Sequence, residues 1–242
     1  MIAPDKIKKL AVLLDPDDTG NSDFEGLISL ADECRVDYFL VGGSTTFIKP
    51  GELISGIKKI TSVPVYIFPG NLLQLDPCAD GILLLSLISG RNPELLIGNH
   101  VVAAPQLKKM GVDIVPVGYI LVSSGVRSSV EYMSQTEAIP AGKKDIAVAT
   151  AMAGELLGLK MIYLEAGSGA EYPVPADMIA AVKNNTSIPL IAGGGLRTAA
   201  DVSRAYSAGA DIVVLGNGLA ENPALLSEAC SIRDSINKKG PA

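Results

Sequence analysis

Residues 189–218 read PLIAGGGLRTAADVSRAYSAGADIVVLGNG, and they give the clearest indication of the fold class. Its two aliphatic runs, 189–193 and 212–216, are short, and each ends in glycine. Residues 198–208 between them have a helical spacing of apolar side chains and begin with a threonine, which suits a helix cap. Strand, helix and strand in this order are typical of two parallel strands joined by a crossover helix. The stretch therefore predicts one β–α–β unit.

The same alternation continues along the rest of the chain. The eight strand candidates are residues 10–16, 38–44, 64–70, 81–89, 113–122, 161–166, 189–193 and 212–216. The helical candidates are residues 23–35, 51–60, 93–110, 145–158, 175–184, 198–208 and 223–237. Eight strands alternating with helices predict an α/β fold, a single-domain (β/α)8 TIM barrel over residues 1–242. A doubly wound open sheet is the alternative, but LLDPDDTGN after the first strand lacks the GxGxxG pattern of dinucleotide-binding sheets.

The connection between the third and fourth strand candidates interrupts this pattern. Residues 71–80, NLLQLDPCAD, are too few for a crossover helix of the usual length, and Pro77 breaks them. We therefore expect the third helix of the barrel to be missing or replaced by a short non-helical connection. A missing helix would leave an apolar gap in the side of the barrel.

Composition excludes several classes of function. The chain has 20 Lys and Arg against 26 Asp and Glu, a formal net charge of −6, and it lacks the cationic face of a nucleic-acid binder. The single histidine, His100, rules out a metal site built from several histidines. Three widely spaced cysteines, Cys34, Cys78 and Cys230, suit neither a disulfide framework nor a zinc knuckle.

No apolar run approaches the roughly 20 residues of a membrane span, so we expect a soluble, cytoplasmic protein.

Glycine-rich loops follow the last two strand candidates, at the end of a barrel where catalytic groups lie. GGG at 193–195 precedes the helix that begins near Thr198, and GNG at 216–218 follows the eighth strand. Backbone N–H groups in such loops can approach an anion closely, and a helix amino terminus adds a favourable dipole. One glycine run could be only a tight turn. Two of them, after strands seven and eight, predict a phosphate-binding site.

The sixth strand candidate ends in a carboxylate. It reads YLEAGSG at 163–169, and the period of two places Tyr163 and Glu165 on one face of the strand. Burying a carboxylate without a partner is costly, so Glu165 is either held by a structural hydrogen bond or functional. Beside a phosphate loop, it is well placed to accept a proton from a substrate hydroxyl. Residues 167–169 would add amide donors to the same anion.

Oxygen-bearing side chains end the first two strand candidates. Asp15 lies directly at the end of the first strand, and Asp17 and Asp18 follow as an acidic turn. Carboxylates suit Mg²⁺, which takes one or two of them and completes its shell with water and substrate phosphates. The second strand ends in GGSTT at 42–46, which could hold a second phosphate or offer a hydroxyl to the ion. Asp15 is therefore the candidate metal ligand.

Five motifs, in this order and spacing, resemble those of the geranylgeranylglyceryl phosphate synthase family, also called the PcrB-like family. They are LLDPD at 13–17, VGGST at 41–45, YLEAGSGA at 163–170, GGGLRT at 193–198 and GNG at 216–218. YLEAGSGA is specific where GGG is not, and SSVEYMSQTEAIP at 128–140 is similar too. The resemblance covers most of the chain.

The resemblance implies a TIM-barrel prenyltransferase that makes an ether lipid precursor. It would join the C3 hydroxyl of sn-glycerol 1-phosphate to a polyprenyl diphosphate, and the family's name implies geranylgeranyl diphosphate. The reaction would use Mg²⁺ and release diphosphate. It implies that Asp15 and Ser44 bind the metal ion and that Glu165 orients or deprotonates the attacking hydroxyl. The positions implied to bind glycerol phosphate are Tyr163, Leu164, Glu165, Ala166, Gly167, Ser168, Gly169, Gly194, Gly195, Gly216 and Asn217. Family members also lack a regular third helix, which suggests that the prenyl chain lies beside residues 71–80.

The sequence departs from the family in two places and leaves other functions open. Asp18 stands where the family often has Lys, and the chain has no Trp for the positions that limit chain length in some relatives. One alternative is another phosphate-handling barrel enzyme, such as a sugar-phosphate isomerase or lyase, which needs no long apolar groove. The other is a non-catalytic binding protein. We further expect a homo-oligomer, with Tyr132 as a candidate contact residue, and transient contact with a membrane surface during product release.

Overall fold

The computed structural model describes residues 7–17, 24–44, 46–125 and 127–239, and in them eight parallel strands form a closed barrel. The strands are β1 (Lys9–Leu14), β2 (Tyr38–Val41), β3 (Val65–Ile67), β4 (Gly81–Leu87), β5 (Asp113–Leu121), β6 (Met161–Glu165), β7 (Leu190–Gly193) and β8 (Ile212–Leu215). Each strand pairs with the next one along the chain, and β8 closes the barrel on β1, with Ile212 opposite Lys9. The predicted (β/α)8 barrel is confirmed, and the open sheet is wrong.

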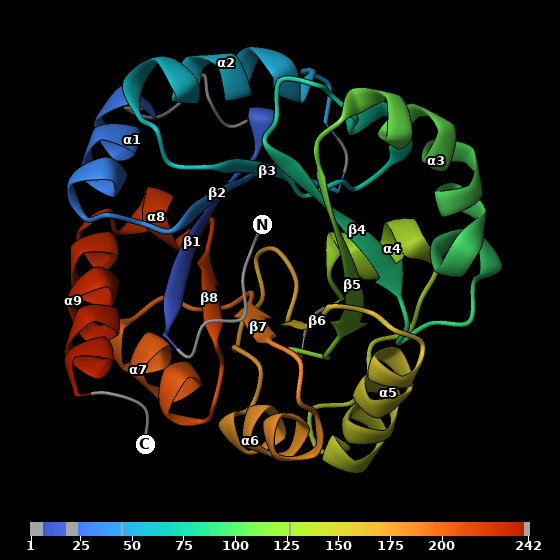
Figure 1. Cartoon of the computed structure of the whole chain (residues 1–242). Helices are drawn as coiled ribbons and strands as arrows, with labels where there is room; N and C mark the ends of the chain where they lie inside the picture. The colour runs from blue at the N-terminus through green and yellow to red at the C-terminus, as the bar shows by residue number, and fades with distance from the viewer. Residues whose placement is uncertain (1–6, 18–23, 45, 126, 240–242) are drawn as a thin grey trace.

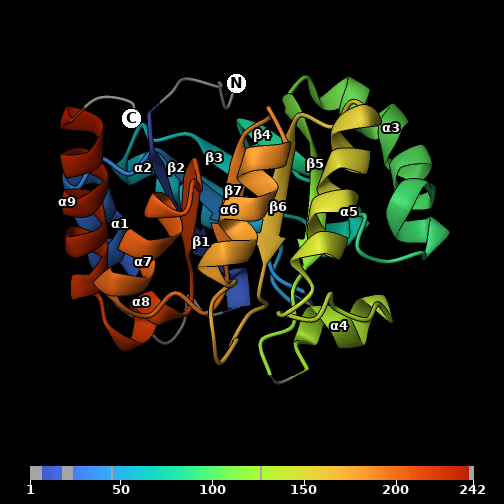
Figure 2. The same ribbon diagram turned by 90° about the horizontal axis from the view of Figure 1, so that it is seen from below.

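Helices surround the barrel (Figure 1). They are α1 (Phe24–Glu33), α2 (Pro50–Ile60), α3 (Asn99–Met110), α5 (Lys144–Leu156), α6 (Ala176–Asn185), α7 (Ala199–Ser207) and α9 (Ala224–Lys238). Two short helices, α4 (Ser129–Ser134) and α8 (Gly218–Glu221), lie at one and the same end of the molecule (Figure 2). Within the described ranges, no helix is both long enough and apolar enough to cross a bilayer.

The connection between β3 and β4 lacks a crossover helix, as the sequence predicts. Residues 68–80 are all described, and they contain a three-residue 3-10 helix, η2 (Leu72–Gln74). The buried Gln74 side chain donates to the carbonyl of Gly43 at 2.8 Å and accepts from the amide of Gly70 at 3.0 Å. These two hydrogen bonds hold the connection against the loop after β2. After β4, a π-helical turn, η3 (Glu94–Gly98), leads directly into α3.

Side chains alternate along each strand between the barrel interior and the layer under the helices. In β6, Met161 and Tyr163 belong to the interior cluster, whereas Ile162 and Leu164 belong to the outer cluster that packs against the helices. This is the two-residue period of a strand in a closed barrel. It places Glu165, the last residue of β6, on the inward face with Tyr163.

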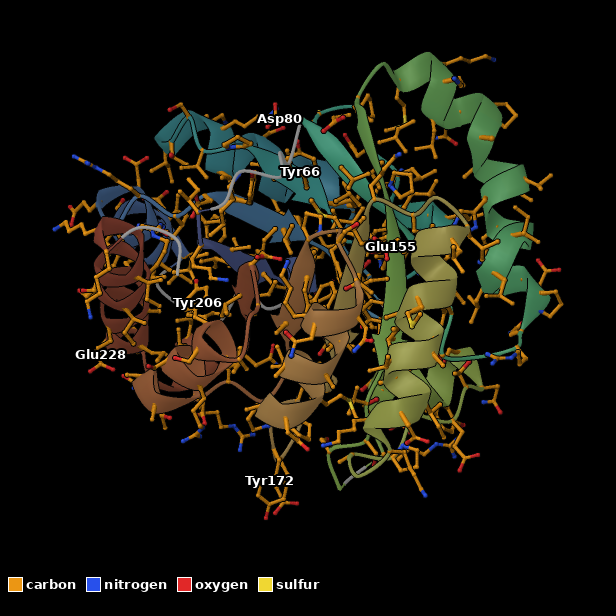
Figure 3. All side chains as sticks on the ribbon, turned by 60° about the horizontal axis from the view of Figure 1, so that its bottom comes forward. Tyr66, Asp80, Glu155, Tyr172, Tyr206 and Glu228 are labelled. Atoms are coloured by element: carbon orange, nitrogen blue, oxygen red, sulfur yellow. The ribbon has the colours of Figure 1, made fainter. Side chains whose placement is uncertain are left out.

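Polar contacts close the amino-terminal end of the barrel. In the interior, Lys9 Nζ donates to the Tyr38 hydroxyl at 3.2 Å, and the Tyr66 hydroxyl donates to Asp113 Oδ2 at 2.9 Å. The rings of Tyr38 and Tyr66 pack edge to face with centroids 5.7 Å apart. Tyr172, in the loop after β6, lies at the opposite end of the molecule from Tyr66 (Figure 3). Side chains therefore fill the amino-terminal half of the interior, and a ligand cavity can open only at the carboxyl ends of the strands.

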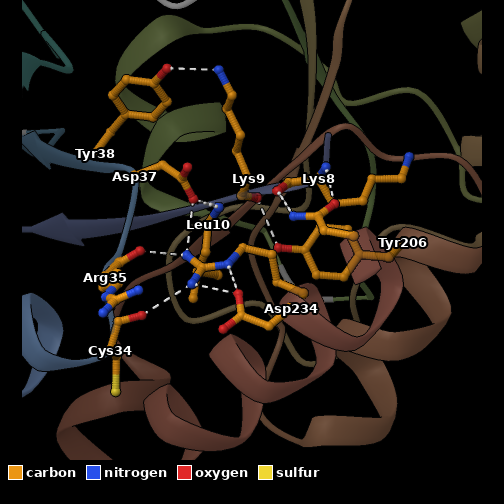
Figure 4. A network of polar contacts seen from close by, with 11 residues as sticks. Lys8, Lys9, Leu10, Cys34, Arg35, Asp37, Tyr38, Tyr206 and Asp234 are labelled. Atoms are coloured by element: carbon orange, nitrogen blue, oxygen red, sulfur yellow. Dashed lines mark hydrogen bonds and ion pairs between the residues drawn. The ribbon is translucent and has the colours of Figure 1, made fainter. Parts of the chain in front are cut away.

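Outside the barrel, α9 is tied to the first two strands (Figure 4). The buried Arg233 side chain donates to the carbonyls of Cys34 and Arg35 and to the Asp37 carboxylate, at 3.0, 2.7 and 3.0 Å. Asp37 also accepts from the amide of Leu10 at 2.8 Å. Because every donor of the buried cation needs a partner, this network fixes where the last helix lies against β1 and β2.

Candidate active site

A cavity of about 340 Å³ opens at the carboxyl ends of β1, β2, β6, β7 and β8. Every predicted site residue except Leu164 and Ala166 lines it; these residues are Asp15, Ser44, Tyr163, Glu165, Gly167, Ser168, Gly169, Gly194, Gly195, Gly216 and Asn217. The side chains of Leu164 and Ala166 instead pack in the outer cluster under the helices. Those two residues can reach a ligand only through their backbone, and the Ala166 amide already donates to the carbonyl of Gly193 at 3.0 Å.

Glu165 is the buried carboxylate of this cavity. It is 5% exposed, and its Oε1 accepts a hydrogen bond from the Gly167 amide at 2.7 Å. Burial raises the pKa of Glu165 to about 7, although the Gly167 amide and the nearby Tyr163 hydroxyl favour the ionised form. A carboxyl with this pKa can exist in either protonation state near neutral pH, as a general base requires.

Tyr163 lies on the same inward face and is fully buried. Burial, followed by the neighbouring Glu165 charge, raises the pKa of Tyr163 well above its usual value, so the phenol stays protonated. Its hydroxyl forms no hydrogen bond of good geometry with any described residue. A buried hydroxyl without a partner is costly, so this group is available to a ligand in the cavity.

Gly194 makes the close approach of β6 and the loop after β7 possible. Its φ is +79°, and a Cβ atom there would lie 2.3 Å from Glu165 Oε1 and 2.7 Å from the Gly167 nitrogen. No side chain fits this space, and the left-handed conformation also disfavours one. The glycine therefore lets the backbone of the loop face the cavity directly beside Glu165.

A Gly194→Ala variant is expected to bind inorganic phosphate at least about tenfold more weakly and to lose about 1–3 kcal/mol of unfolding free energy. Isothermal titration calorimetry and denaturant unfolding would measure the two effects. Gly142→Ala is the matched control, because no atom lies within 4 Å of a Cβ at that exposed position. Equal phosphate affinity in the two variants would contradict a role for the Gly194 backbone.

The loops that the sequence predicts to bind phosphate line the same cavity, and two of them are linked to each other. Asn217 Nδ2 donates to Ser168 Oγ at 3.1 Å, which joins the loop after β8 to the loop after β6. Thr198 caps α7, its hydroxyl accepting from the Asp201 amide while Asp201 accepts from the Thr198 amide. Arg197, which sequence reasoning missed, is the one cationic side chain among the described residues that line the cavity. Amides and one guanidinium thus face the same space.

Asp15 and Ser44 line this cavity after the ends of β1 and β2. A Cβ at Gly43 would lie 2.1 Å from Asp15 Oδ2, so glycine leaves room for that carboxylate. Asp17 does not line the cavity; its carboxylate instead accepts from the amides of Phe47 and Ile48. Asp18 lies outside the described residues. No cluster of three or more His, Cys, Asp or Glu residues occurs in the described ranges, so these ranges alone offer no complete metal shell of such side chains.

This donor set nevertheless fits Mg²⁺. The ion takes hard oxygen ligands and usually keeps several water or phosphate oxygens, with one or two carboxylates from the protein. Asp15 supplies the carboxylate and Ser44 the hydroxyl, and both face the cavity that would hold a phosphate group. A thiolate or imidazole metal such as Zn²⁺ finds no suitable ligands among the described residues of this cavity.

An apolar groove of about 340 Å³ lies beside the polar cavity. The 69–75 connection, β4, α3 and α4 form its walls, largely with Leu72, Leu75, Ile82, Leu84, Leu85, Leu87 and Leu95. His100 also lines it, and its Nε2 makes a hydrogen bond of 3.1 Å with Ser86 Oγ. Five residues line both the groove and the polar cavity: Gly43, Ser44, Phe68, Tyr119 and Val130. The two spaces therefore meet, at the side of the barrel where the sequence predicts a gap.

Known proteins resemble this chain over nearly its whole length. Residues 5–233 match the model of the PcrB family. Geranylgeranylglyceryl phosphate synthase of Spirosoma linguale is 48% identical over 232 residues, which are 96% of this chain and 93% of that protein. The synthase of Korarchaeum cryptofilum, with the same name, is 37% identical over 94% of this chain and 93% of its own.

A solved structure has the same fold. The crystal structure of (S)-3-O-geranylgeranylglyceryl phosphate synthase from Thermoplasma acidophilum, in complex with its substrate sn-glycerol-1-phosphate, superimposes with a TM-score of 0.87. It is 31% identical, and the match covers 96% of this chain and 94% of that one. Because the family model matches almost all of the sequence and these relatives exceed 30% identity over most of their length, the chain belongs to the PcrB family.

Proposed function

We propose that this chain is a prenyltransferase that joins the C3 hydroxyl of sn-glycerol 1-phosphate to a polyprenyl diphosphate such as geranylgeranyl diphosphate. The observation that carries the proposal is that a polar cavity with a buried carboxylate shares five lining residues with an apolar groove beside it. A phosphate-handling isomerase or lyase, or a binding protein for a small phosphate, has no use for the groove. The names of the Spirosoma and Korarchaeum relatives, and the substrate in the Thermoplasma structure, support the same activity.

The proposed reaction assigns a task to each part of the polar cavity. The glycine loops at 194–195 and 216–217, with Arg197, bind the phosphate of glycerol phosphate through amides and one guanidinium. Glu165 then accepts the proton of the C3 hydroxyl as the hydroxyl oxygen attacks the first carbon of the prenyl chain. The bond between that carbon and the diphosphate oxygen breaks, and its electron pair leaves with diphosphate. The products are the prenylglyceryl phosphate ether and diphosphate.

Asp15 and Ser44 are the residues that we propose hold Mg²⁺ in this reaction. When bound, the ion would neutralise charge on the diphosphate as it leaves. Asp15 and Ser44 follow β1 and β2, whereas the glycine loops follow β7 and β8, and all of them line the one cavity. The chain itself supplies few cations there, since Arg197 is the one among the described lining residues.

The rate is expected to rise with pH through about 7, the pKa to which burial raises Glu165. Only the ionised carboxylate can accept the hydroxyl proton, and it predominates above this pKa. The expected profile is therefore a rise in kcat/KM of about tenfold per pH unit below about 6, levelling off above about 8. Steady-state rates between pH 5 and 9 would measure it, and a flat profile would exclude Glu165 as the base.

A product assay tests the proposed function. Purified protein, Mg²⁺ and radiolabelled sn-glycerol 1-phosphate would be incubated with prenyl diphosphates of several chain lengths, and lipid product extracted. We expect labelled ether lipid with at least one donor and much less with glycerol 3-phosphate, because the loops and Glu165 hold one arrangement of phosphate and hydroxyl. Phosphate binding without product from any donor would support one of the alternatives.

We also propose that copies of the chain assemble with one another. Ile97, Val101 and Val102, in η3 and α3, are 60%, 66% and 68% exposed, which supports a contact on this outer face. Multi-angle light scattering on the purified protein tests this, and a monomer at micromolar concentration would contradict it.

A further inference from the structure

Three aromatic rings meet where the polar cavity opens into the apolar groove. Phe68 directly follows β3, Tyr119 lies in β5, and Tyr163 lies in β6. The ring centroids are 5.8 Å apart for Phe68 and Tyr119, 5.5 Å for Phe68 and Tyr163, and 5.3 Å for Tyr119 and Tyr163. Each ring thus touches the other two. Phe68 and Tyr119 line both spaces, and Tyr163 lines the polar cavity.

This junction is where the reacting carbon must lie if the proposed function is correct. A prenyl diphosphate has a polar head that belongs with Asp15 and the glycine loops, and a hydrocarbon chain that belongs in the groove. The bond that breaks joins these two parts, so its carbon atom lies at the opening between the two spaces. Glu165, two residues beyond Tyr163 on the same inward face, lies on the cavity side of this opening.

Positive charge builds on that carbon as its bond to diphosphate breaks. Aromatic ring faces attract a cation through their quadrupole, and the attraction is strongest where water is excluded. Unlike a carboxylate or an imidazole, a ring face does not form a bond with the cation. Tyr119 is 4% exposed and Tyr163 fully buried, so the surroundings are of low polarity. His100, the one imidazole of the chain, lines the groove and not the polar cavity.

We infer that Phe68 and Tyr119 are catalytic residues whose ring faces stabilise the allylic cation, with Tyr163 as the third wall of the same aromatic site. The inference rests on the proposed function and adds residues to it. In the prenyl transfer step, the bond between the first prenyl carbon and the diphosphate oxygen breaks, and its electron pair leaves with diphosphate. The glycerol phosphate oxygen then forms the new bond to the carbon, and its proton goes to Glu165. The rings stabilise the positive charge on the carbon electrostatically and form no bond in the reaction.

Phe68→Leu is the first test variant, because it removes the ring and keeps an apolar side chain at a half-buried position. Two probes separate charge from shape: a prenyl chain that carries an ammonium group near its head, and the uncharged isosteric chain, each with inorganic diphosphate. We expect the variant to bind the ammonium probe about tenfold more weakly than the wild type does. The uncharged probe should bind within about twofold of the wild-type affinity. Turnover should fall about tenfold with little change in the KM of the donor.

Two further variants show which property of the side chains matters. Tyr119→Phe keeps the ring and should retain the preference for the ammonium probe, which would separate the ring from the hydroxyl. Leu72→Ala is the control, since Leu72 lines the groove and not the cavity. It should weaken both probes by the same factor, because it removes hydrocarbon contact alone.

The outcomes distinguish this inference from the function on which it rests. If the wild type makes no ether lipid from any donor, the proposed function fails and the ring assignment fails with it. If the wild type makes product but Phe68→Leu keeps the full preference for the ammonium probe, the ring assignment is overturned and the function stands. Loss of that preference in Phe68→Leu, with the uncharged probe unaffected, supports the inference.

Discussion

Replacing Glu165 with Gln is expected to lower turnover by about 100- to 10,000-fold, the usual contribution of a positioned general base. Gln keeps the size of the side chain and can still accept the Gly167 amide, so the loop after β6 should hold its shape. It cannot take the proton of the substrate hydroxyl. The affinity for glycerol phosphate should change only a few-fold, because in the proposed reaction the glycine loops and Arg197, which line the cavity, bind the phosphate.

The comparison requires separate measurements of turnover and binding. Steady-state kinetics at pH 8 would give kcat, and calorimetry with sn-glycerol 1-phosphate alone would give the dissociation constant. Glu171→Gln is the matched control, since Glu171 is an exposed carboxylate in the same loop that does not line the cavity. Its turnover should equal that of the wild type. Unchanged turnover in Glu165→Gln would remove Glu165 from the mechanism.

The two-residue period of side chains along a strand, and the position of residues at strand ends, predicted much of this site. The two-residue alternation of YLEAG placed Tyr163 and Glu165 together on an inward face, and the structure finds both of them lining the cavity. The same alternation turns Leu164 outward, so a residue inside a motif need not present its side chain to the ligand. The glycine loops after β7 and β8 could be predicted to lie together, because the carboxyl ends of all strands in a closed parallel barrel lie at the same end of the barrel.

The aromatic residues at the junction could not be predicted in the same way. Phe68 directly follows the apolar strand β3, and Tyr119 lies within an apolar run; each has the local sequence of an ordinary core residue. Their role depends on the groove beside them, and the groove forms only when the 69–75 connection, β4, α3 and α4 pack together. α4, six residues long, also escaped prediction, because its limits come from the capping of Ser128 and Glu131 more than from any periodicity.

The structure also explains how a chain with a net negative charge could bind anionic substrates. A net charge of −6 does not favour the binding of two anionic substrates. However, the groups that we propose bind the anions are backbone amides and one arginine, and amides do not contribute to a count of Lys and Arg. Asp15 even places negative charge in the cavity. A divalent cation held by Asp15 would offset this charge and that of the leaving diphosphate.

Removing divalent cations is expected to reduce turnover by at least about 1,000-fold, because a metal ion supplies several kcal/mol of stabilisation to a departing diphosphate. With a single described cation, Arg197, lining the cavity, the chain has little to replace the ion. The protein would be treated with EDTA, exchanged into metal-free buffer and assayed with increasing Mg²⁺. Activity should return in a saturable way. Full activity without any divalent cation would contradict the metal assignment.

Asp15→Asn should raise the Mg²⁺ concentration for half-maximal activity by at least about tenfold, since a neutral amide binds the ion far less well than a carboxylate. Asp17→Asn is the matched control two residues away. Asp17 accepts from the amides of Phe47 and Ile48 and does not line the cavity, and an amide oxygen can keep accepting there. If Asp15 is the ligand, only the first variant shifts the Mg²⁺ titration, whereas a general effect of lost negative charge would shift both equally. An equal shift would therefore move the metal away from Asp15, and a shift confined to Asp17→Asn would place it in the loop that joins β1 to β2.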